Sequence, residues 1–127
     1  MSQLKIPGGY QAVMPYLVVP GAEEFADFMK TVFDAKETYK QMRSEGVVRH
    51  AQLSINGSTI MFADATEQFP VNTAGMFVYV ENADETYQKA LNQGATSIME
   101  PGDQDYGRSC GVTDPYGNTW WITSVPV

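Results

Sequence analysis

The sequence contains a single cysteine and a single histidine among 127 residues. Cys110 has no partner for an intrachain disulfide, which excludes a disulfide-stapled secreted scaffold and favours a reducing compartment, by default the cytoplasm. One cysteine and one histidine also cannot build a zinc site of Cys and His ligands within one chain. His50 is therefore the only imidazole that the chain has for acid-base or metal chemistry.

Basic residues and long apolar runs are also scarce. Eight Lys and Arg stand against 15 Asp and Glu, and the net charge is −7 at pH 7. A field of that sign repels phosphate backbones and anionic lipid, so neither nucleic acid nor a membrane is expected as a partner. No apolar run reaches the ~20 residues of a membrane span, and residues 1–7 lack the apolar stretch of a signal peptide. With 43% hydrophobic and 18% charged residues, residues 1–127 are expected to fold as one domain.

The first half of the chain predicts a strand, a helix and three further strands. Residues 13–19 are rich in β-forming side chains and end at a Pro-Gly pair, as a strand followed by a turn does. Residues 22–34 carry apolar side chains at helical spacing, with two Glu in the first turn. Further strands, the last two joined by an Asn-Gly hairpin signal, are predicted over residues 37–42, 47–55 and 58–63. We assign residues 13–64 to a first βαβββ module.

The same order repeats in the second half. A strand is predicted over residues 76–80, and Asn82 with Glu85 forms the capping-box pattern that opens a helix ending before Gly94. Further strands are predicted over residues 97–99, 108–113 and 118–124. Three pairs of corresponding residues lie 60 positions apart: Ala35 and Ala95, Gly57 and Gly117, and Thr59 and Thr119. Residues 75–124 thus form a second βαβββ module, and the expected fold class is α+β.

Each module has one helix, which covers one face of its sheet and leaves the other face open. Because strand side chains alternate, Ala51, Leu53 and Ile55 are predicted to face the helix of the first module. Alternation and the 60-residue offset assign these residues to the open faces: Met14, Tyr16, Val48, His50, Gln52, Ser54, Thr59, Met61, Met76, Val78, Thr119, Trp121 and Thr123. This mixture of Met, aromatic and polar side chains is typical of a ligand cleft, and the alternative is an ordinary filled core between the modules.

Several motifs resemble the vicinal oxygen chelate superfamily, which includes glyoxalase I, the bleomycin and fosfomycin resistance proteins and extradiol dioxygenases. Residues 19–29 (VPGAEEFADFM) resemble its first strand-helix motif, and residues 114–122 (DPYGNTWWI) resemble its final hairpin motif. Within the superfamily, the chain resembles the small PhnB-like branch in particular, at residues 10–16, 50–53, 60–64 and 106–109. The resemblance covers nearly the whole chain.

The resemblance implies tandem βαβββ modules around a U-shaped mixed-sheet cleft, built across a homodimer by exchange of modules. In the superfamily each module can give two His, Gln or Glu ligands to a divalent metal that chelates substrate oxygens. In this sequence the matching positions carry Met14, Met61, Met76 and Trp121. None of them supplies an oxygen or imidazole ligand, and thioethers are soft donors unsuited to Mg²⁺, Mn²⁺ or Fe²⁺. No metal cofactor is therefore expected.

Two polar residues, His50 and Arg108, each have more than one possible role. His50 is a candidate general base, a ligand contact, or a strand histidine that only hydrogen-bonds a neighbour. Arg108, beside Tyr106, suits the carboxylate or phosphate of a ligand, or an ion pair with Asp103 or Asp105. The candidate ligand-binding residues are Met14, Tyr16, His50, Gln52, Met61, Met76, Tyr106, Arg108 and Trp121. Cys110 falls on the helix side, where a buried, unreactive thiol is expected.

The preferred function is metal-free binding of a small, partly aromatic or amphipathic molecule, in the manner of bleomycin resistance proteins. The alternative is an enzyme of the glyoxalase type, a lyase, or of the dioxygenase type, acting through His50 or through a ligand set at other positions. A transferase role, with which some relatives are labelled, has no nucleotide or methyl-donor motif to support it. The sequence leaves open which ligand binds, and whether the cleft lies within one chain or across a dimer.

Overall fold

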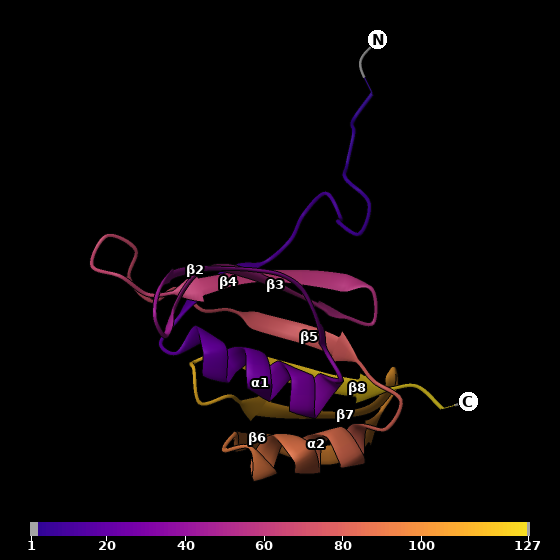
Figure 1. The fold of residues 1–127 in the computed structure, drawn as a ribbon. Helices are drawn as coiled ribbons and strands as arrows, with labels where there is room; N and C mark the ends of the chain where they lie inside the picture. The colour runs from indigo at the N-terminus through magenta and orange to yellow at the C-terminus, as the bar shows by residue number, and fades with distance from the viewer. Residues whose placement is uncertain (1–2, 127) are drawn as a thin grey trace.

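The structure, a computed structural model, describes residues 3–126 and contains two βαβββ modules in succession (Figure 1). The first module consists of β1 (Tyr16–Val19), α1 (Ala22–Phe33), β2 (Lys36–Ser44), β3 (Val47–Ile55) and β4 (Ser58–Asp64). The second consists of β5 (Gly75–Tyr79), α2 (Ala83–Asn92), β6 (Thr96–Gln104), β7 (Gly107–Thr113) and β8 (Thr119–Ser124). The predicted α+β class and the predicted order of elements are confirmed.

Each module folds into its own four-stranded mixed sheet. The strand orders are β1-β4-β3-β2 and β5-β8-β7-β6, so equivalent strands occupy equivalent places. In each sheet the first strand pairs in parallel with the last, while the other neighbours are antiparallel. A parallel pair needs a long crossover connection, and the helix and two intervening strands of each module supply it.

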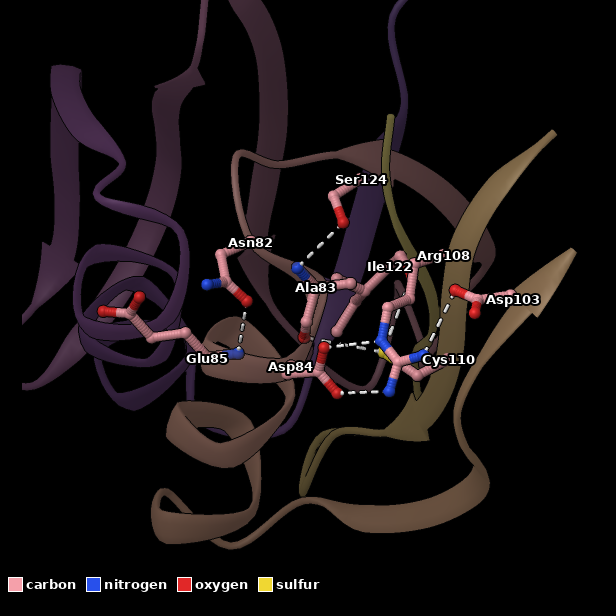
Figure 2. Close-up of polar contacts among 9 residues, drawn as sticks. All are labelled: Asn82, Ala83, Asp84, Glu85, Asp103, Arg108, Cys110, Ile122 and Ser124. Carbon is pink, nitrogen blue, oxygen red and sulfur yellow. Dashed lines mark hydrogen bonds and ion pairs between the residues drawn. The ribbon is translucent and has the colours of Figure 1, made fainter. Parts of the chain in front are cut away.

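Side chains at the end of the last strand fix the start of each helix. Oδ1 of Asp64 accepts hydrogen bonds from the backbone N–H groups of Gly21 (3.2 Å) and Ala22 (2.7 Å). Sixty residues later, Oγ of Ser124 accepts a hydrogen bond from the N–H of Ala83 (3.1 Å), as Figure 2 shows. These contacts stabilise N–H groups that have no partner within the helix. Within the described residues 3–126, no helix is long and apolar enough to cross a membrane.

The two modules share one hydrophobic core, which they build with their helix-covered faces. α1 packs against α2, and its Phe33 ring centroid lies 4.6 Å from that of Trp120 in the second sheet. The ring of Tyr116 lies 5.4 Å from Phe25 and 6.2 Å from Phe28 of the same helix. Figure 1 shows α1 between the first sheet and strands β7 and β8. The helices therefore hold the modules together, and both open sheet faces point away from this core.

The repeat is not uniform, because the strand and helix that begin each module are related by 61 residues rather than 60. In the first sheet Tyr16 pairs with Met61, and in the second Phe77 pairs with Trp121. Met61 and Trp121 are 60 residues apart, whereas Tyr16 and Phe77 are 61 apart. A shift of one residue moves a strand side chain to the opposite face. The prediction that Met76 and Val78 lie on the open face is therefore wrong: both pack against the core.

A second departure from simple alternation lies at the start of β3. The β2–β3 pairing passes from Gln41 opposite His50 to Met42 opposite Val48, so Arg49 is an unpaired bulge residue. An extra residue in one strand reverses the alternation beyond it. Val48 was predicted to lie on the open face, but it is 2% exposed and belongs to the core.

Parts of both open faces are exposed to solvent in a single chain. Among residues 3–126, no strand of the first sheet packs extensively on a strand of the second, because the modules meet through their helices. Four aromatic residues of these faces, each about half exposed, are Tyr16, Tyr39, Phe77 and Tyr79. A single chain thus presents two separate platforms, rather than one enclosed cleft.

Candidate functional site

The open face of the first sheet carries a row of side chains across its four strands. Tyr16 on β1 pairs with Met61 on β4, and Met61 pairs with Gln52 on β3. Tyr39 of β2 pairs with Gln52 and completes the row. His50 lies two residues from Gln52, with its ring centroid 5.4 Å from that of Tyr16 and 5.9 Å from that of Tyr39. The structure thus brings four of the predicted site residues together, namely Tyr16, His50, Gln52 and Met61.

A chain of hydrogen bonds fixes the polar members of this face. The Tyr10 hydroxyl donates to Oε1 of Gln52 (2.6 Å), and Nε2 of Gln52 lies 2.8 Å from Nε2 of His50. An amide nitrogen only donates, so Nε2 of His50 accepts and the ring proton resides on Nδ1. That Nδ1–H group points to the Tyr16 hydroxyl at 3.0 Å. The Tyr16 O–H proton remains free to donate to a bound molecule.

His50 is held as a neutral imidazole in this network. Its partial burial lowers the pKa below the ordinary value of 6.5, because burial disfavours the charged form. Both ring nitrogens already have hydrogen-bond partners. His50 therefore forms hydrogen bonds with its neighbours, which was one of the three roles that its sequence position allowed. To act as a general base, its imidazole would first have to give up one of these two partners.

The N-terminal segment covers one end of this face. Nε2 of Gln11 donates to the Thr59 carbonyl (3.1 Å), and Oγ1 of Thr59 donates to the Gly9 carbonyl (2.7 Å). Thr59 is 3% exposed and Gln52 is 7% exposed as a result of this cover. Met14 lies before β1 and lines a small pocket of about 250 Å³ within the N-terminal segment. The structure thus places Met14 outside the row that contains Tyr16 and Met61.

The open face of the second sheet is aromatic. The Phe77 ring centroid lies 5.2 Å from Tyr79 and 6.3 Å from Tyr106, and Phe77 pairs with Trp121 across the strands. Tyr106 and Trp121 were predicted site residues, whereas Phe77 and Tyr79 were missed. The 61-residue offset from Tyr16 to Phe77 is the signal that identifies them.

A groove lies between the first sheet and β5, the edge strand of the second sheet. It has a volume of about 360 Å³ and is lined by residues of β4 and β5, including Thr59, Met76 and Tyr79. Met76 therefore reaches a groove wall from the core side, and not from the open face.

Arg108 lies on the helix-covered face of the second sheet, on the same side of β7 as Cys110 (Figure 2). Its guanidinium forms a bidentate ion pair with Asp84 at 2.6 and 3.0 Å and a further contact with Asp103 at 3.2 Å. This contact lowers the pKa of Asp84 and raises the pKa of Arg108. Of the two sequence-based alternatives for Arg108, the structure shows the ion pair, with Asp84 as an additional partner.

Cys110 is fully buried, as predicted. Its Sγ lies 3.5 Å from the carbonyl oxygen of Ile122 and 3.8 Å from that of Ala83. Burial raises the pKa of the thiol to about 11, so the nucleophilic thiolate is rare near neutral pH.

The side chains on the open faces do not fit a divalent metal ion. The paired positions nearest the middle of the two faces carry Tyr16, Met61, Phe77 and Trp121. The only imidazole nearby, that of His50, is bonded through both nitrogens. Among residues 3–126, no group of three or more His, Cys, Asp or Glu side chains is arranged to hold a metal ion. Hard divalent ions need such oxygen and nitrogen donors.

Two βαβββ modules with parallel first-to-last strand pairs and open faces define a paired-module α+β class. The chain belongs to the Glyoxalase/Bleomycin resistance protein/Dioxygenase superfamily, whose family model matches residues 10–122. The match spans both modules and confirms the resemblance noted in the sequence.

The chain is also similar to individual proteins and solved structures along most of its length. The protein Mb0911c of Mycobacterium bovis and Rv0887c of Mycobacterium tuberculosis are each 36% identical to this chain in an alignment of 121 residues. The alignments cover 86% of this chain, 80% of Mb0911c and 71% of Rv0887c. The PhnB protein from Bacillus cereus has a TM-score of 0.73 at 25% identity, covering 91% of this chain and 100% of that one. TioX from Micromonospora sp. ML1 has a TM-score of 0.70 at 23% identity, covering 92% and 98%.

Proposed function

We propose that the protein binds a small, partly aromatic or amphipathic molecule on its open sheet faces, without a divalent metal ion. One observation carries this proposal: half-exposed aromatic side chains stand beside a polar network whose members are already fixed by hydrogen bonds. Aromatic rings give stacking surface, Met61 adapts to irregular shapes, and the Tyr16 hydroxyl offers a positioned donor. Such a face is organised before the ligand arrives, which reduces the entropy cost of binding.

The enclosing wall of the site comes from a second copy of the chain in this proposal. Each chain has one face built around Tyr16 and Met61 and one built around Phe77 and Trp121. Exchange of modules in a homodimer sets the first face of one chain against the second face of the other, and so makes two equivalent clefts.

Two similar structures support a small-molecule ligand. They are named as an antibiotic binding protein, TnmS3 from Streptomyces sp. CB03234, and as fosfomycin resistance protein FosX from Mesorhizobium loti. The unpaired Cys110 supports a location in the cytoplasm.

The two tryptophans provide the test of binding. Trp121 lies on an open face, whereas Trp120 is 1% exposed in the core. The neutral probe 2-naphthol is therefore expected to quench Trp121 emission saturably in the wild type. The same probe should produce less maximal quenching in a Trp121→Phe variant, whose remaining Trp120 is buried in the core. Absence of saturable quenching in the wild type would overturn the proposal.

The assembly is tested separately. Light scattering should give a mass of twice the 14.0 kDa chain. A single-chain mass over a wide concentration range would remove the second copy from the proposal.

A further inference from the structure

We propose that a pocket beside Tyr16 is an anion subsite, which selects ligands that carry a carboxylate or comparable anionic group next to an aromatic part. This inference rests on the proposed function and adds to it the chemical class of the ligand. The pocket has a volume of about 480 Å³, and its walls include Tyr16, Arg43, Arg49, Asp64 and Phe69. Tyr16 also forms part of the row on the open face, so the pocket continues the candidate site.

Two β-bulges supply the arginines of this pocket. The β2–β3 pairing skips Arg49 between His50 and Val48, and on the opposite strand it skips Arg43 between Met42 and Ser44. A bulge takes a residue out of the regular alternation and turns its side chain in a new direction, and bulges are frequent near functional sites. Here two separate bulges lead to the same place, since Arg43 and Arg49 line one pocket.

The charges of these arginines are not used elsewhere in the fold. The chain has three arginines, and Arg108 is paired with Asp84 and Asp103. Within residues 3–126, neither Arg43 nor Arg49 forms an ion pair with a carboxylate. Two guanidinium groups in one pocket repel each other unless an anion lies between them, and their planar forks match a carboxylate.

The acidic residue of the pocket wall is already engaged. Oδ1 of Asp64 accepts hydrogen bonds from the N–H groups of Gly21 and Ala22, and Oδ2 accepts one from Val48 at 2.7 Å. These three bonds hold the carboxylate against the backbone, at the start of α1. Asp64 is thus a structural anchor, and the arginines remain the groups of the pocket that are available to a ligand.

The pocket also has an aromatic residue in its wall, Phe69. Phe69 is 56% exposed and is held by two hydrogen bonds with Thr66, one from its N–H to Oγ1 (3.0 Å) and one from the Thr66 N–H to its carbonyl (2.8 Å). Two backbone hydrogen bonds between Val18 and Asn72, at 3.0 and 2.9 Å, tie the same loop to β1. A pocket lined by an aromatic ring and two arginines favours a ligand that is both flat and anionic.

The test compares two probes of the same shape, 2-naphthoate and its uncharged amide 2-naphthamide, by titration of the ¹⁵N-labelled wild type. The three arginine Nε–H signals are assigned from single Arg→Gln variants. The expected result is roughly tenfold tighter binding of 2-naphthoate, in line with the strength of charge-assisted hydrogen bonds. The Arg43 and Arg49 signals should shift on binding, and the Arg108 signal should not.

Variants separate the pocket from net charge. Arg43→Gln/Arg49→Gln should bring 2-naphthoate to the affinity of 2-naphthamide. Lys36→Gln/Lys89→Gln, which removes the same charge from two sites outside the pocket, should preserve the preference. Equal affinity for both probes in the wild type, or loss of the preference in the lysine control, overturns the anion subsite alone. Failure of both probes to bind overturns the proposed function as well.

Discussion

The six-membered ring of Trp121 lies directly over Gly111, so closely that a Cβ atom at Gly111 would stand 2.5 Å from Cζ3 of the indole. The two residues are paired across β7 and β8, on the open face of the second sheet. Only glycine leaves room for the ring to lie on the sheet in this way. The exposed side of the indole is consequently available as a stacking surface.

Gly111→Ala should therefore displace the Trp121 indole. The added methyl group overpacks the site, which costs about 1–3 kcal/mol of the free energy of unfolding, and the loss of the stacking surface weakens 2-naphthol binding roughly two- to tenfold. Tryptophan emission and urea denaturation measure the two effects. Gly75→Ala is the matched control, because a Cβ at Gly75 meets nothing within 4 Å. An unchanged affinity in Gly111→Ala contradicts the role of Trp121.

Asp114→Asn should destabilise the fold more than any exposed substitution. Its Oδ1 accepts from the N–H groups of Tyr116 and Asn118, both at 2.9 Å, and its Oδ2 accepts from Nδ2 of Asn118 (3.1 Å) and Nε1 of Trp120 (2.8 Å). The amide of Asn replaces one acceptor oxygen with a donor and leaves buried N–H groups without partners. The expected loss is about 2–4 kcal/mol in the free energy of unfolding, measured by denaturant titration.

The exposed Asp105→Asn is the control for this loss, and it should change the free energy of unfolding by less than about 0.5 kcal/mol. Similar values for the two variants would show that the hydrogen bonds of Asp114 add little to stability.

The sequence was sufficient to predict the order of helices and strands in both modules, because each element has a local signal. The Asn82 cap is an example: its Oδ1 accepts the Glu85 N–H at 3.1 Å, as the capping pattern predicts. The faces of the strands were less predictable, since they depend on single residues. One extra position between Tyr16 and Phe77 moved Met76 to the core, and the bulge at Arg49 did the same to Val48. The extra position is visible only when the two modules are aligned with each other, and the bulge arises from strand pairing, so local composition signals neither.

Cys110 should be inert toward thiol reagents in the folded protein. With a pKa of about 11, on the order of one thiol in a thousand is ionised at pH 8, and the sulfur is also fully buried. Reaction with 5,5′-dithiobis(2-nitrobenzoate) should therefore follow unfolding, and be complete only in denaturant. Rapid labelling of the native protein would show that β7 opens readily.

Stability should fall as the pH drops below about 6.5 because of His50. Burial lowers the pKa of His50 in the folded state, so the unfolded chain binds its proton at a higher pH than the folded chain does. The contribution to the free energy of unfolding is complete above the unfolded pKa of about 6.5, and it is lost as the pH falls toward the lower pKa of the folded state.

As the chain has one histidine, its ring proton signal in NMR reports this titration directly. The difference in stability between wild type and His50→Gln should shrink over the same range, while carboxylate titrations common to both cancel. A midpoint at or above 6.5 would mean that the hydrogen bonds with Gln52 and Tyr16 favour the imidazolium form, and that the assigned direction of the network is wrong.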